Sequence, residues 1–304
     1  MSAILEVHNL QKSFKGFSLQ EISFSLERGY IMGFIGPNGA GKSTTIKLIM
    51  NLLKRNGGTI AVCGLDNLKS EKEIKNKIGF VYDENYYYED LTVAQTKKII
   101  APFYRNWDDG AFQKYLRDFA LPVHKKIKEL SRGMKMKFSL AVALSHHAEL
   151  LIMDEPTSGL DPVIRSELLE ILSWAMQDDR HGIFFSTHIT SDLEKIADYI
   201  TFINDGRIEF SAAKDDIVDN FGLVKGAREL LSSDLKEHLI GMRENQFGFE
   251  GLVRDKHLVK RLFRDSVVIE KPSLDEIMLY FTRRPQNVQP DFKRSAYPEK
   301  DGSA

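Results

Sequence analysis

A glycine-rich loop is the first feature of the sequence that could do chemistry. Residues 36–43 read Gly-Pro-Asn-Gly-Ala-Gly-Lys-Ser, which fits the phosphate-loop pattern GxxxxGK[S/T]. Glycines let backbone N–H groups curve around phosphate oxygens, and the positive end of a following helix adds to the attraction. The pattern predicts that Lys42 reaches the β- and γ-phosphates and that Ser43 ligates Mg²⁺. A plain glycine-rich turn does not explain the Lys-Ser pair at this spot.

A second candidate lies where an apolar run ends in two carboxylates. Residues 150–153 are Leu-Leu-Ile-Met, and Asp154 and Glu155 follow directly. A strand here places the two carboxylates on opposite sides of the chain, at the carboxyl edge where α/β sheets bind ligands. Asp154 then suits a contact to Mg²⁺, and Glu155 suits polarising the water that attacks a phosphate. The alternative is a pair of solvated charges at a strand end.

A third candidate is the start of a helix near Met134. Ser131 is a good N-cap for it, and Gly133 lets the backbone approach another group closely. Free N–H groups at this end favour an anion. Lys135 and Lys137 in the first turn oppose the helix dipole, which indicates that negative charge comes close. The alternative is an ordinary capped core helix with solvated lysines.

Together these segments resemble the ATP-binding domains of ABC transporters, from about residue 3 to residue 215. GPNGAGKST matches that family's Walker A motif, and LLIMDEPTSGLD at 150–161 matches its Walker B motif, catalytic glutamate and D-loop. STH, ending at His188, matches the switch histidine. LSRGM at 130–134 lies where the signature LSGGQ belongs, and Phe14 lies where an aromatic residue stacks on adenine.

The resemblance implies a fold, a reaction and a set of site residues. The fold is α/β: a P-loop NTPase of the ABC type, with a RecA-like core, an antiparallel β subdomain and a helical subdomain. Two such subunits close head to tail on two ATP molecules, with Mg²⁺, and hydrolyse them. The implied catalytic residues are Glu155, His188 and Lys42. The implied nucleotide-binding residues are Phe14, Gly36, Asn38, Gly39, Gly41, Lys42, Ser43, Thr44, Ser131, Gly133 and Asp161. The implied metal ligands are Ser43, Asp154 and Asp83.

Two departures from the family pattern bear on activity. The signature has Arg132 and Met134 where glycine and glutamine are usual, and Asp83 stands at the position of the Q-loop glutamine. Both changes fall on groups that contact phosphate, water or Mg²⁺ in the family. They predict weak basal ATP hydrolysis.

Composition places the chain among soluble globular proteins and bears on its partners. It has 304 residues, a net charge of −1 and one cysteine, Cys63, so no intrachain disulfide can form. A near-neutral charge argues against nucleic acid as a partner. The start is not a signal peptide, and no apolar run approaches the roughly 20 residues that span a bilayer. We therefore expect a cytoplasmic subunit, peripheral on the membrane, that pairs with an integral permease and with a second ABC ATPase subunit, identical or different.

Apolar and helical periodicity outline the elements that position these residues. Strands are predicted at residues 4–7, 22–26, 30–35, 59–62, 150–153, 183–187, 199–203 and 207–210. Helices are predicted at residues 43–53, 92–104, 108–119, 134–145 and 162–176. Residues 1–220 are expected to form the ATPase domain, with a helical insert at about 84–147.

The segment after residue 220 has a different pattern. We expect a C-terminal accessory domain at 221–284, with a helix at 224–239, strands at 247–253 and 266–269, and a disordered tail at 285–304. Ser-Leu-Asp-Glu at 273–276 is a capping box that opens a last short helix. This ending resembles the tail of subunits paired with ABC-2-type permeases, the YtrB-like group in particular.

Two other functions remain open at this point. A soluble ABC ATPase acting on ribosomes or nucleic acid shares the motifs, although such ribosomal proteins usually carry two cassettes and this chain carries one. A P-loop kinase or GTPase leaves the signature, the D-loop and His188 unexplained. The tyrosines at 86–88 predict a docking surface for the permease, the alternative being that they pack within the insert.

Overall fold

The central layer of the protein is a six-stranded sheet in the order β10-β9-β3-β8-β7-β6. The computed structural model describes residues 3–82, 86–263 and 266–282. The sheet consists of β3 (Ile31–Ile35), β6 (Ile78–Tyr82), β7 (Leu150–Asp154), β8 (Gly182–Thr187), β9 (Tyr199–Asn204) and β10 (Arg207–Ala213). All neighbours are parallel except β9 and β10, which pair antiparallel around Asp205-Gly206. Every residue of β3, β7 and β8 is buried, as expected for parallel strands covered on both faces.

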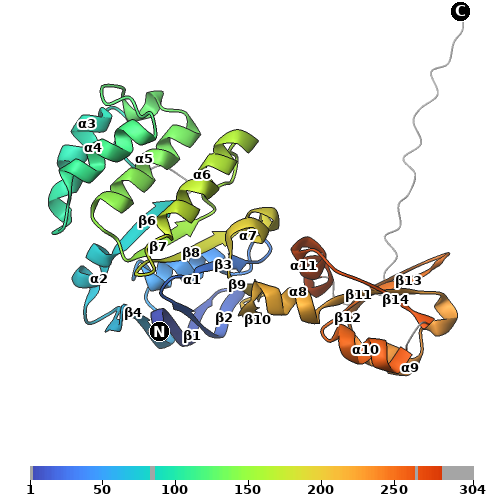
Figure 1. Ribbon diagram of the computed structural model, residues 1–304. Helices are drawn as coiled ribbons and strands as arrows, with labels where there is room; N and C mark the ends of the chain where they lie inside the picture. Colours follow the sequence, from blue (N-terminus) through green and yellow to red (C-terminus); the bar gives the residue numbers. More distant parts are fainter. Residues whose placement is uncertain (1–2, 83–85, 264–265, 283–304) are drawn as a thin grey trace, which may run out of the picture.

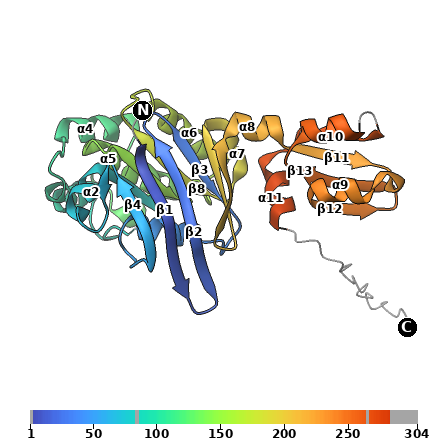
Figure 2. The same ribbon diagram turned by 90° about the horizontal axis from the view of Figure 1, so that it is seen from below.

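An antiparallel sheet covers one side of this layer. It has the order β2-β1-β4-β5 and contains β1 (Ala3–Phe14), β2 (Phe17–Glu27), β4 (Gly57–Val62) and β5 (Leu65–Asp66). Helix α1 (Lys42–Ile49) packs its buried residues into the same core, while α2 (Glu71–Lys77) precedes β6. Figure 2 shows β1 and β2 as one long hairpin that extends beyond the layer.

Helices cover the opposite side, above β6–β8 in Figure 1. They are α3 (Val93–Ile100), α4 (Asp109–Asp118), α5 (Arg132–Ser145) and α6 (Pro162–Ala175), with short 3₁₀ turns at Ala101–Phe103 and Ile127–Glu129. Each of the four begins at a side-chain cap, which explains where the chain enters the helix. The caps are Thr92, Asp108, Ser131 and Asp161.

The last elements form a second lobe with its own sheet, beside the first lobe in both ribbon views. Helices α7 (Thr190–Ile196) and α8 (Lys214–Asn220) precede it. The lobe contains β11 (Gly222–Gly226), a 3₁₀ turn (Arg228–Leu230), α9 (Ser233–His238), β12 (Leu239–Asn245), β13 (Gly248–Val253), α10 (Lys256–Phe263), β14 (Val268–Glu270) and α11 (Leu274–Thr282). Its strands are antiparallel in the order β12-β13-β11-β14.

Two expectations about elements are corrected here, and two elements of the second lobe were missed. Residues 224–239 are not one helix: β11 takes the first part because Leu223 and Val224 are buried in the second sheet, and only α9 is helical. Helix α1 ends at Ile49, before the expected 53. Strand β12 and helix α10 were not expected at all; β12 lies at the edge of the sheet and ends in Arg-Glu-Asn, so it carries little apolar alternation.

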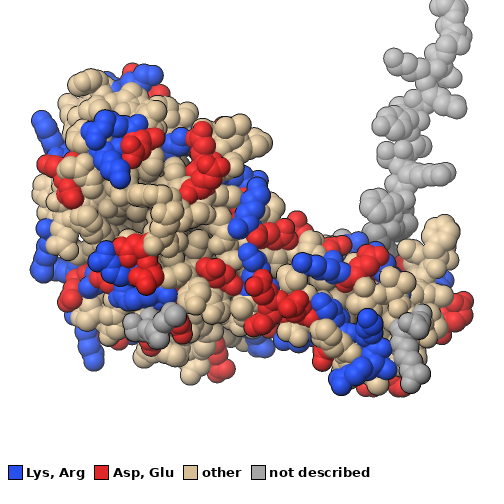
Figure 3. All heavy atoms as spheres, viewed as in Figure 1, with Lys and Arg blue, Asp and Glu red and all other residues tan. Residues whose placement is uncertain are grey.

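The predicted tail at 285–304 and Asp83 lie outside the described residues. Within the residues that are described, no helix is long and apolar enough to cross a bilayer. On the face seen in Figure 3, basic and acidic side chains are interspersed over the first lobe, which agrees with the near-zero net charge.

Candidate functional site

The phosphate loop joins β3 to α1 with the geometry that the glycines predict. Gly36 is buried, and a Cβ atom there would collide with the Ile203 carbonyl. Gly41 adopts φ +113°, in the left-handed region that favours glycine, and it is the N-cap of α1 without any side-chain cap. The first N–H groups of α1 are therefore not capped by a side chain of the loop, as an anion site requires. Asn38 and Gly39 are exposed at the loop tip.

The three predicted catalytic side chains meet at the carboxyl edge of the sheet. The Glu155 carboxylate lies between the other two: its Oε1 is 3.4 Å from Lys42 Nζ, and its Oε2 is 2.7 Å from His188 Nδ1. The His188 backbone N–H also donates to Oε2, at 3.2 Å. Lys42 Nζ further donates to the Gly36 carbonyl at 2.8 Å. The sequence places these residues in three separate segments, and the fold gathers them at one point.

Backbone conformation contributes to this arrangement. Glu155 adopts φ +50°, a region that non-glycine residues seldom occupy. Its N–H donates to the Ser186 carbonyl on β8 at 2.9 Å, which fixes the turn after β7. This conformation directs the Glu155 side chain toward Lys42 and His188. A strained conformation held by surrounding hydrogen bonds is a feature of functional sites.

The predicted magnesium ligands have the right chemistry for a hard cation. Asp154 is 5% exposed at the end of β7, and Ser43 is exposed in the first turn of α1. The Ser186 hydroxyl opposite Asp154 on β8 and the Thr157 hydroxyl are buried and have no hydrogen-bond partner among the residues that the structure describes. These orphaned groups, with a carboxylate and a hydroxyl, fit an oxygen-bound, partly hydrated ion. In the described part of the chain, no three His, Cys, Asp or Glu residues cluster as a metal site, so phosphate oxygens and waters would complete the shell.

Ser186 was missed by the sequence reasoning. It lies inside an apolar strand run, and only its place two residues before His188 could have drawn attention to it.

The predicted adenine platform lies at the end of β1. The Phe14 ring is 44% exposed, stacks at 6.5 Å on Phe17, and has Lys12 Nζ 5.2 Å from its centroid. Phe17 reaches the phosphate loop, since its ring is one of the nearest groups to a Cβ built on Gly41. An exposed aromatic face next to the loop suits stacking on a base.

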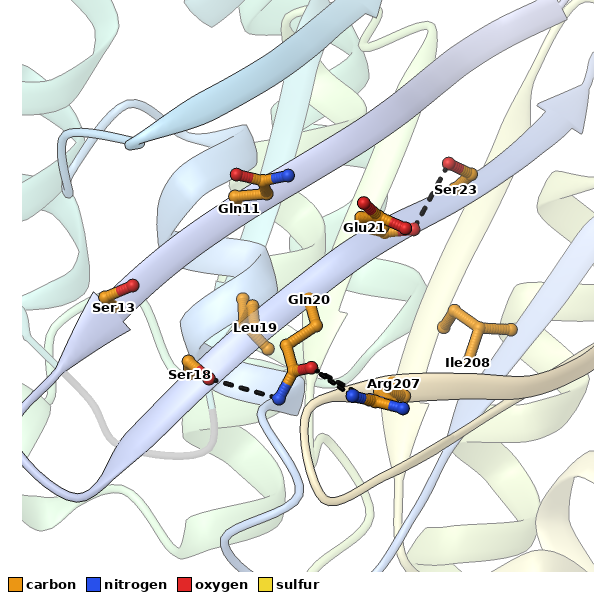
Figure 4. A pocket seen from close by; sticks show the side chains of 9 residues that line it. All are labelled: Gln11, Ser13, Ser18, Leu19, Gln20, Glu21, Ser23, Arg207 and Ile208. Carbon is orange, nitrogen blue, oxygen red and sulfur yellow. Dashed lines mark hydrogen bonds between the residues drawn. The ribbon is translucent and has the colours of Figure 1, made fainter.

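A polar groove lies on the outer face of β1, β2 and β10 (Figure 4). Gln20 crosses it: its Nε2 donates to the Ser18 hydroxyl at 3.3 Å, and its Oε1 accepts from Arg207 Nε at 3.0 Å. The groove contains none of the predicted site residues. The bond between Gln20 and Arg207 joins β2 of the antiparallel sheet to β10 of the central sheet.

The signature segment has a different environment. The Ser131 hydroxyl caps α5 by accepting from Met134 N–H at 3.2 Å, as predicted. Arg132 packs on Gly159 of the D-loop. Gly133 is buried against Ile164 of α6, so its close backbone approach is to its own chain.

The other residues near this end form contacts within the chain. Lys135 lies 3.8 Å from Glu89, and Lys137 pairs with Glu167, so carboxylates of the chain already supply the negative charge that the two lysines indicated. Asp161 caps α6, its Oδ1 accepting from Val163 and Ile164 N–H, both at 3.1 Å. The N-cap reading of Asp161 is confirmed, and its role at a dimer interface stays a prediction.

The tyrosine cluster divides between core and surface. Tyr87 packs inward against Phe138, with ring centroids 4.9 Å apart, and burial raises the pKa of its hydroxyl to about 12. Tyr86 and Tyr88 are exposed, at 72% and 71%. Neighbouring tyrosines cannot face the same core, as expected from the sequence, and the two outer rings remain available to a partner.

Comparison with known proteins agrees with this geometry. A family described as "ABC transporter" matches residues 19–158, and a shorter match at residues 126–191 is described as "AAA domain, putative AbiEii toxin, Type IV TA system". The bacitracin transport ATP-binding protein BcrA of Bacillus licheniformis is 33% identical over 211 residues, which cover 68% of this chain and 69% of BcrA. The ABC transporter ATP-binding protein YtrB of Bacillus subtilis (strain 168) is 27% identical over 219 residues, 72% of this chain and 75% of YtrB.

A solved structure supports the same fold. The structure of an ATP-binding subunit of an ABC transporter superposes with a TM-score of 0.65 and 29% identity, covering 70% of this chain and 91% of that one. The P-loop α/β fold of the ABC type is thereby confirmed. These relatives are all named as ABC-transporter or transport subunits, which favours transport over an ATPase directed at ribosomes or nucleic acid.

Proposed function

Because this chain belongs to the ABC transporter ATP-binding proteins, an ATPase family whose members drive a separate membrane permease, we propose that its carboxyl-edge cluster is the hydrolytic site of such a subunit. The observation that carries the proposal is the position of Glu155, within 3.4 Å of Lys42 and 2.7 Å of His188. In the proposed arrangement Lys42 and the first N–H groups of α1 bind the phosphates, and Phe14 stacks on the adenine.

The three side chains divide the hydrolytic step between them. Glu155 accepts a hydrogen bond from the attacking water and takes its proton as the bond from the water oxygen to the γ-phosphorus forms. The bond between the γ-phosphorus and the β–γ bridging oxygen breaks in the same step, and ADP and inorganic phosphate are the products. Lys42 and His188 donate to γ-phosphate oxygens and stabilise the charge that spreads over them. Ser43 and Asp154 would hold Mg²⁺, which neutralises the charge on the β- and γ-phosphates. Lys42 and His188 also keep the carboxylate of Glu155 in place between them before water arrives.

The signature end suits a second subunit. Ser131 is exposed at the start of α5, a 14-residue helix whose first turn contains no acidic residue. We propose that the Ser131 side chain and the backbone N–H of Gly133, in the first turn of α5, face the γ-phosphate on the phosphate loop of a partner subunit, identical or different, in a head-to-tail dimer. Asp161 at the start of α6 would line the same interface.

The exposed tyrosines suit the permease. Tyr86 and Tyr88 lie just after the end of β6, and Tyr82 contacts Tyr86 edge to face at 5.0 Å. A segment of the membrane partner could pack on these rings. It would then be connected through β6 and its neighbour β7 to the carboxyl edge of the sheet, where Glu155 lies. We propose that this surface holds the subunit at the cytoplasmic face of the membrane.

The test is ATP hydrolysis by the purified chain with matched variants. Lys42→Ala is expected to weaken ATP binding, and His188→Ala to lower turnover by roughly 100-fold or more, as for the loss of a group acting in the transition state. Lys47→Ala, at an exposed position on α1, and His124→Ala, an exposed histidine, are the controls and keep wild-type activity. Wild-type turnover in His188→Ala contradicts its assignment.

A further inference from the structure

The second lobe contacts the ATPase lobe next to the segment that carries His188. Helix α11 lies between α7 and the second sheet in both ribbon views. The Thr190 hydroxyl at the start of α7 donates to Asp275 Oδ1 at 2.6 Å. One turn later, Glu194 Oε1 accepts from the Leu274 N–H at 3.1 Å. Two hydrogen bonds therefore join α7 to the first turn of α11.

Thr190 is close to His188 in the chain and is firmly packed. It is 2% exposed, and the intervening Ile189 donates its N–H to Thr187 Oγ1 at 3.0 Å. Ile189 is the N-cap of α7 and provides no side-chain cap, so the helix start depends on contacts from elsewhere. The hydrogen bond that the Thr190 hydroxyl donates to Asp275 is such a contact. A shift of the Thr190 backbone is transmitted across one residue to His188.

The other side of α7 contacts α6, the helix that follows the D-loop. Asp192 is fully buried, and its Oδ1 accepts from Arg165 Nε on α6 at 2.5 Å. Arg165 also donates to the Ser191 hydroxyl at 2.7 Å. Helix α7 is thus held between α6 and α11, and His188 sits at the end where both attachments act.

Helix α11 is held by a capping box at its start and by packing of two aromatic side chains near its end. Ser273 and Glu276 form the predicted capping box, with Glu276 N–H donating to Ser273 Oγ at 3.2 Å and Ser273 N–H donating to Glu276 Oε2 at 2.8 Å. Tyr280 is 1% exposed and donates to Glu250 on β13. Phe281 packs among aromatic rings of β9 and β10. Asp275 therefore presents its carboxylate from a fixed position.

We propose that Asp275 is a positioning residue for ATP hydrolysis. Its hydrogen bond to Thr190 fixes the start of α7 and so keeps His188 in contact with Glu155. Through this bond the C-terminal lobe sets the turnover rate of a site to which it contributes no atom. The inference rests on the proposed role of His188.

A purely structural interface makes a different prediction. If the Thr190–Asp275 bond only attached the second lobe, its loss would lower the free energy of unfolding without a specific effect on the step that uses His188. If the bond positions His188, its loss lowers kcat, leaves the KM for ATP nearly unchanged, and has no further effect once His188 is gone.

The experiment is a set of steady-state and ligand-binding measurements on the full chain. Asp275→Ala and Thr190→Val remove either partner, and each is expected to lower kcat roughly 5- to 10-fold, the scale of one charge-assisted hydrogen bond. The double variant is expected to lose no more than one single variant, because both remove the same bond. Asp275→Asn and Thr190→Ser keep an acceptor and a hydroxyl and are expected to restore most of kcat. Glu270→Ala, which removes an exposed partner of Lys225 in the second sheet, is the matched control.

The His188→Ala background separates the two hypotheses. In the presence of His188, Asp275→Ala is expected to lower kcat, whereas in the His188→Ala background Asp275→Ala is expected to lower kcat no further. Equilibrium ATP binding, measured with the Glu155→Gln change present so that ATP persists, is expected to change little in Asp275→Ala. Equal losses with and without His188, or wild-type kcat in both Asp275→Ala and Thr190→Val, overturn the positioning role alone. Wild-type turnover in His188→Ala overturns the proposed function of that residue instead.

Discussion

The phosphate-loop edge and the signature end of α5 both contact phosphate in the proposed mechanism, yet they are built differently. At the edge, Lys42, Glu155 and His188 come from three segments and contact one another within one chain. At the signature end, the Ser131 hydroxyl has a single hydrogen-bond partner among the described residues, Met134 N–H of its own helix. The comparison teaches that folding alone brings the residues of the edge together, whereas in the proposed mechanism the signature end acts on a nucleotide held by a second subunit.

The largest expected effect is on ATP turnover, from a change at the phosphate-loop edge. Glu155→Gln keeps the size of the side chain but removes the group that takes the proton, so turnover is expected to fall by roughly 100-fold or more. ATP affinity is expected to remain, since Lys42 and the loop are unchanged. Phosphate release and equilibrium nucleotide binding measure the two quantities. Glu149→Gln, directly before β7 and so at its other end, is the control, and unchanged turnover in Glu155→Gln would remove Glu155 from the mechanism.

The second prediction tests the dependence on a partner. With ATP, the Glu155→Gln variant is expected to sediment as a dimer, and adding Ser131→Arg is expected to leave it monomeric, because a long side chain fills the space for the γ-phosphate. Ser173→Arg, at an exposed position on α6, is the control and keeps the dimer. If Ser131→Arg also dimerises, or if the parent stays monomeric even with its membrane partner present, the head-to-tail arrangement is wrong.

A smaller effect is expected at Gly133, where the same signature end also packs within the chain. A Cβ at this position would collide with Ile164, so Gly133→Ala is expected to lower the free energy of unfolding by about 1–3 kcal/mol, the usual cost of overpacking. Adding Ile164→Ala makes room and is expected to return part of that loss, a coupling that a double-mutant cycle in urea measures. Additive losses would show that the two residues do not compete for space.

The sequence predicts the local elements of the phosphate-loop edge better than it predicts contacts between distant segments, and the reasons are physical. The phosphate loop and Asp154-Glu155 each lie in one short segment whose chemistry is local, so spacing alone predicted their elements. The contact of Glu155 with His188 depends on the parallel pairing of β7 and β8, which only the resemblance to a family could suggest. The link between Thr190 and Asp275 spans 85 residues and two lobes, and no local pattern encodes it. Strand β11 was read as helix because its neighbours in the second sheet, not its own propensity, decide its conformation.

The far end of α5 contrasts with its signature end, since it is anchored wholly inside the chain. His146, the C-cap of α5, is 1% exposed and stacks on Tyr104 with ring centroids 3.8 Å apart. Burial lowers the pKa of this imidazole from 6.5 to about 4. It is therefore neutral in the folded protein at neutral pH, and in the window between pH 6.5 and 4 the unfolded chain binds a proton that the folded chain does not.

The smallest expected effect follows from this pKa. Stability is lost as pH falls through that window, and at pH 5.5 the loss due to His146 is expected to be about 1 kcal/mol relative to pH 7.5. His146→Phe keeps a ring on Tyr104 but cannot titrate, so its free energy of unfolding is expected to fall less than that of the wild type between the two pH values. His147→Asn, which removes the neighbouring exposed imidazole, is expected to keep the wild-type difference. Urea unfolding at pH 7.5 and 5.5 measures it, and equal pH dependence in wild type and His146→Phe would show that His146 can take up a proton in the folded protein without cost.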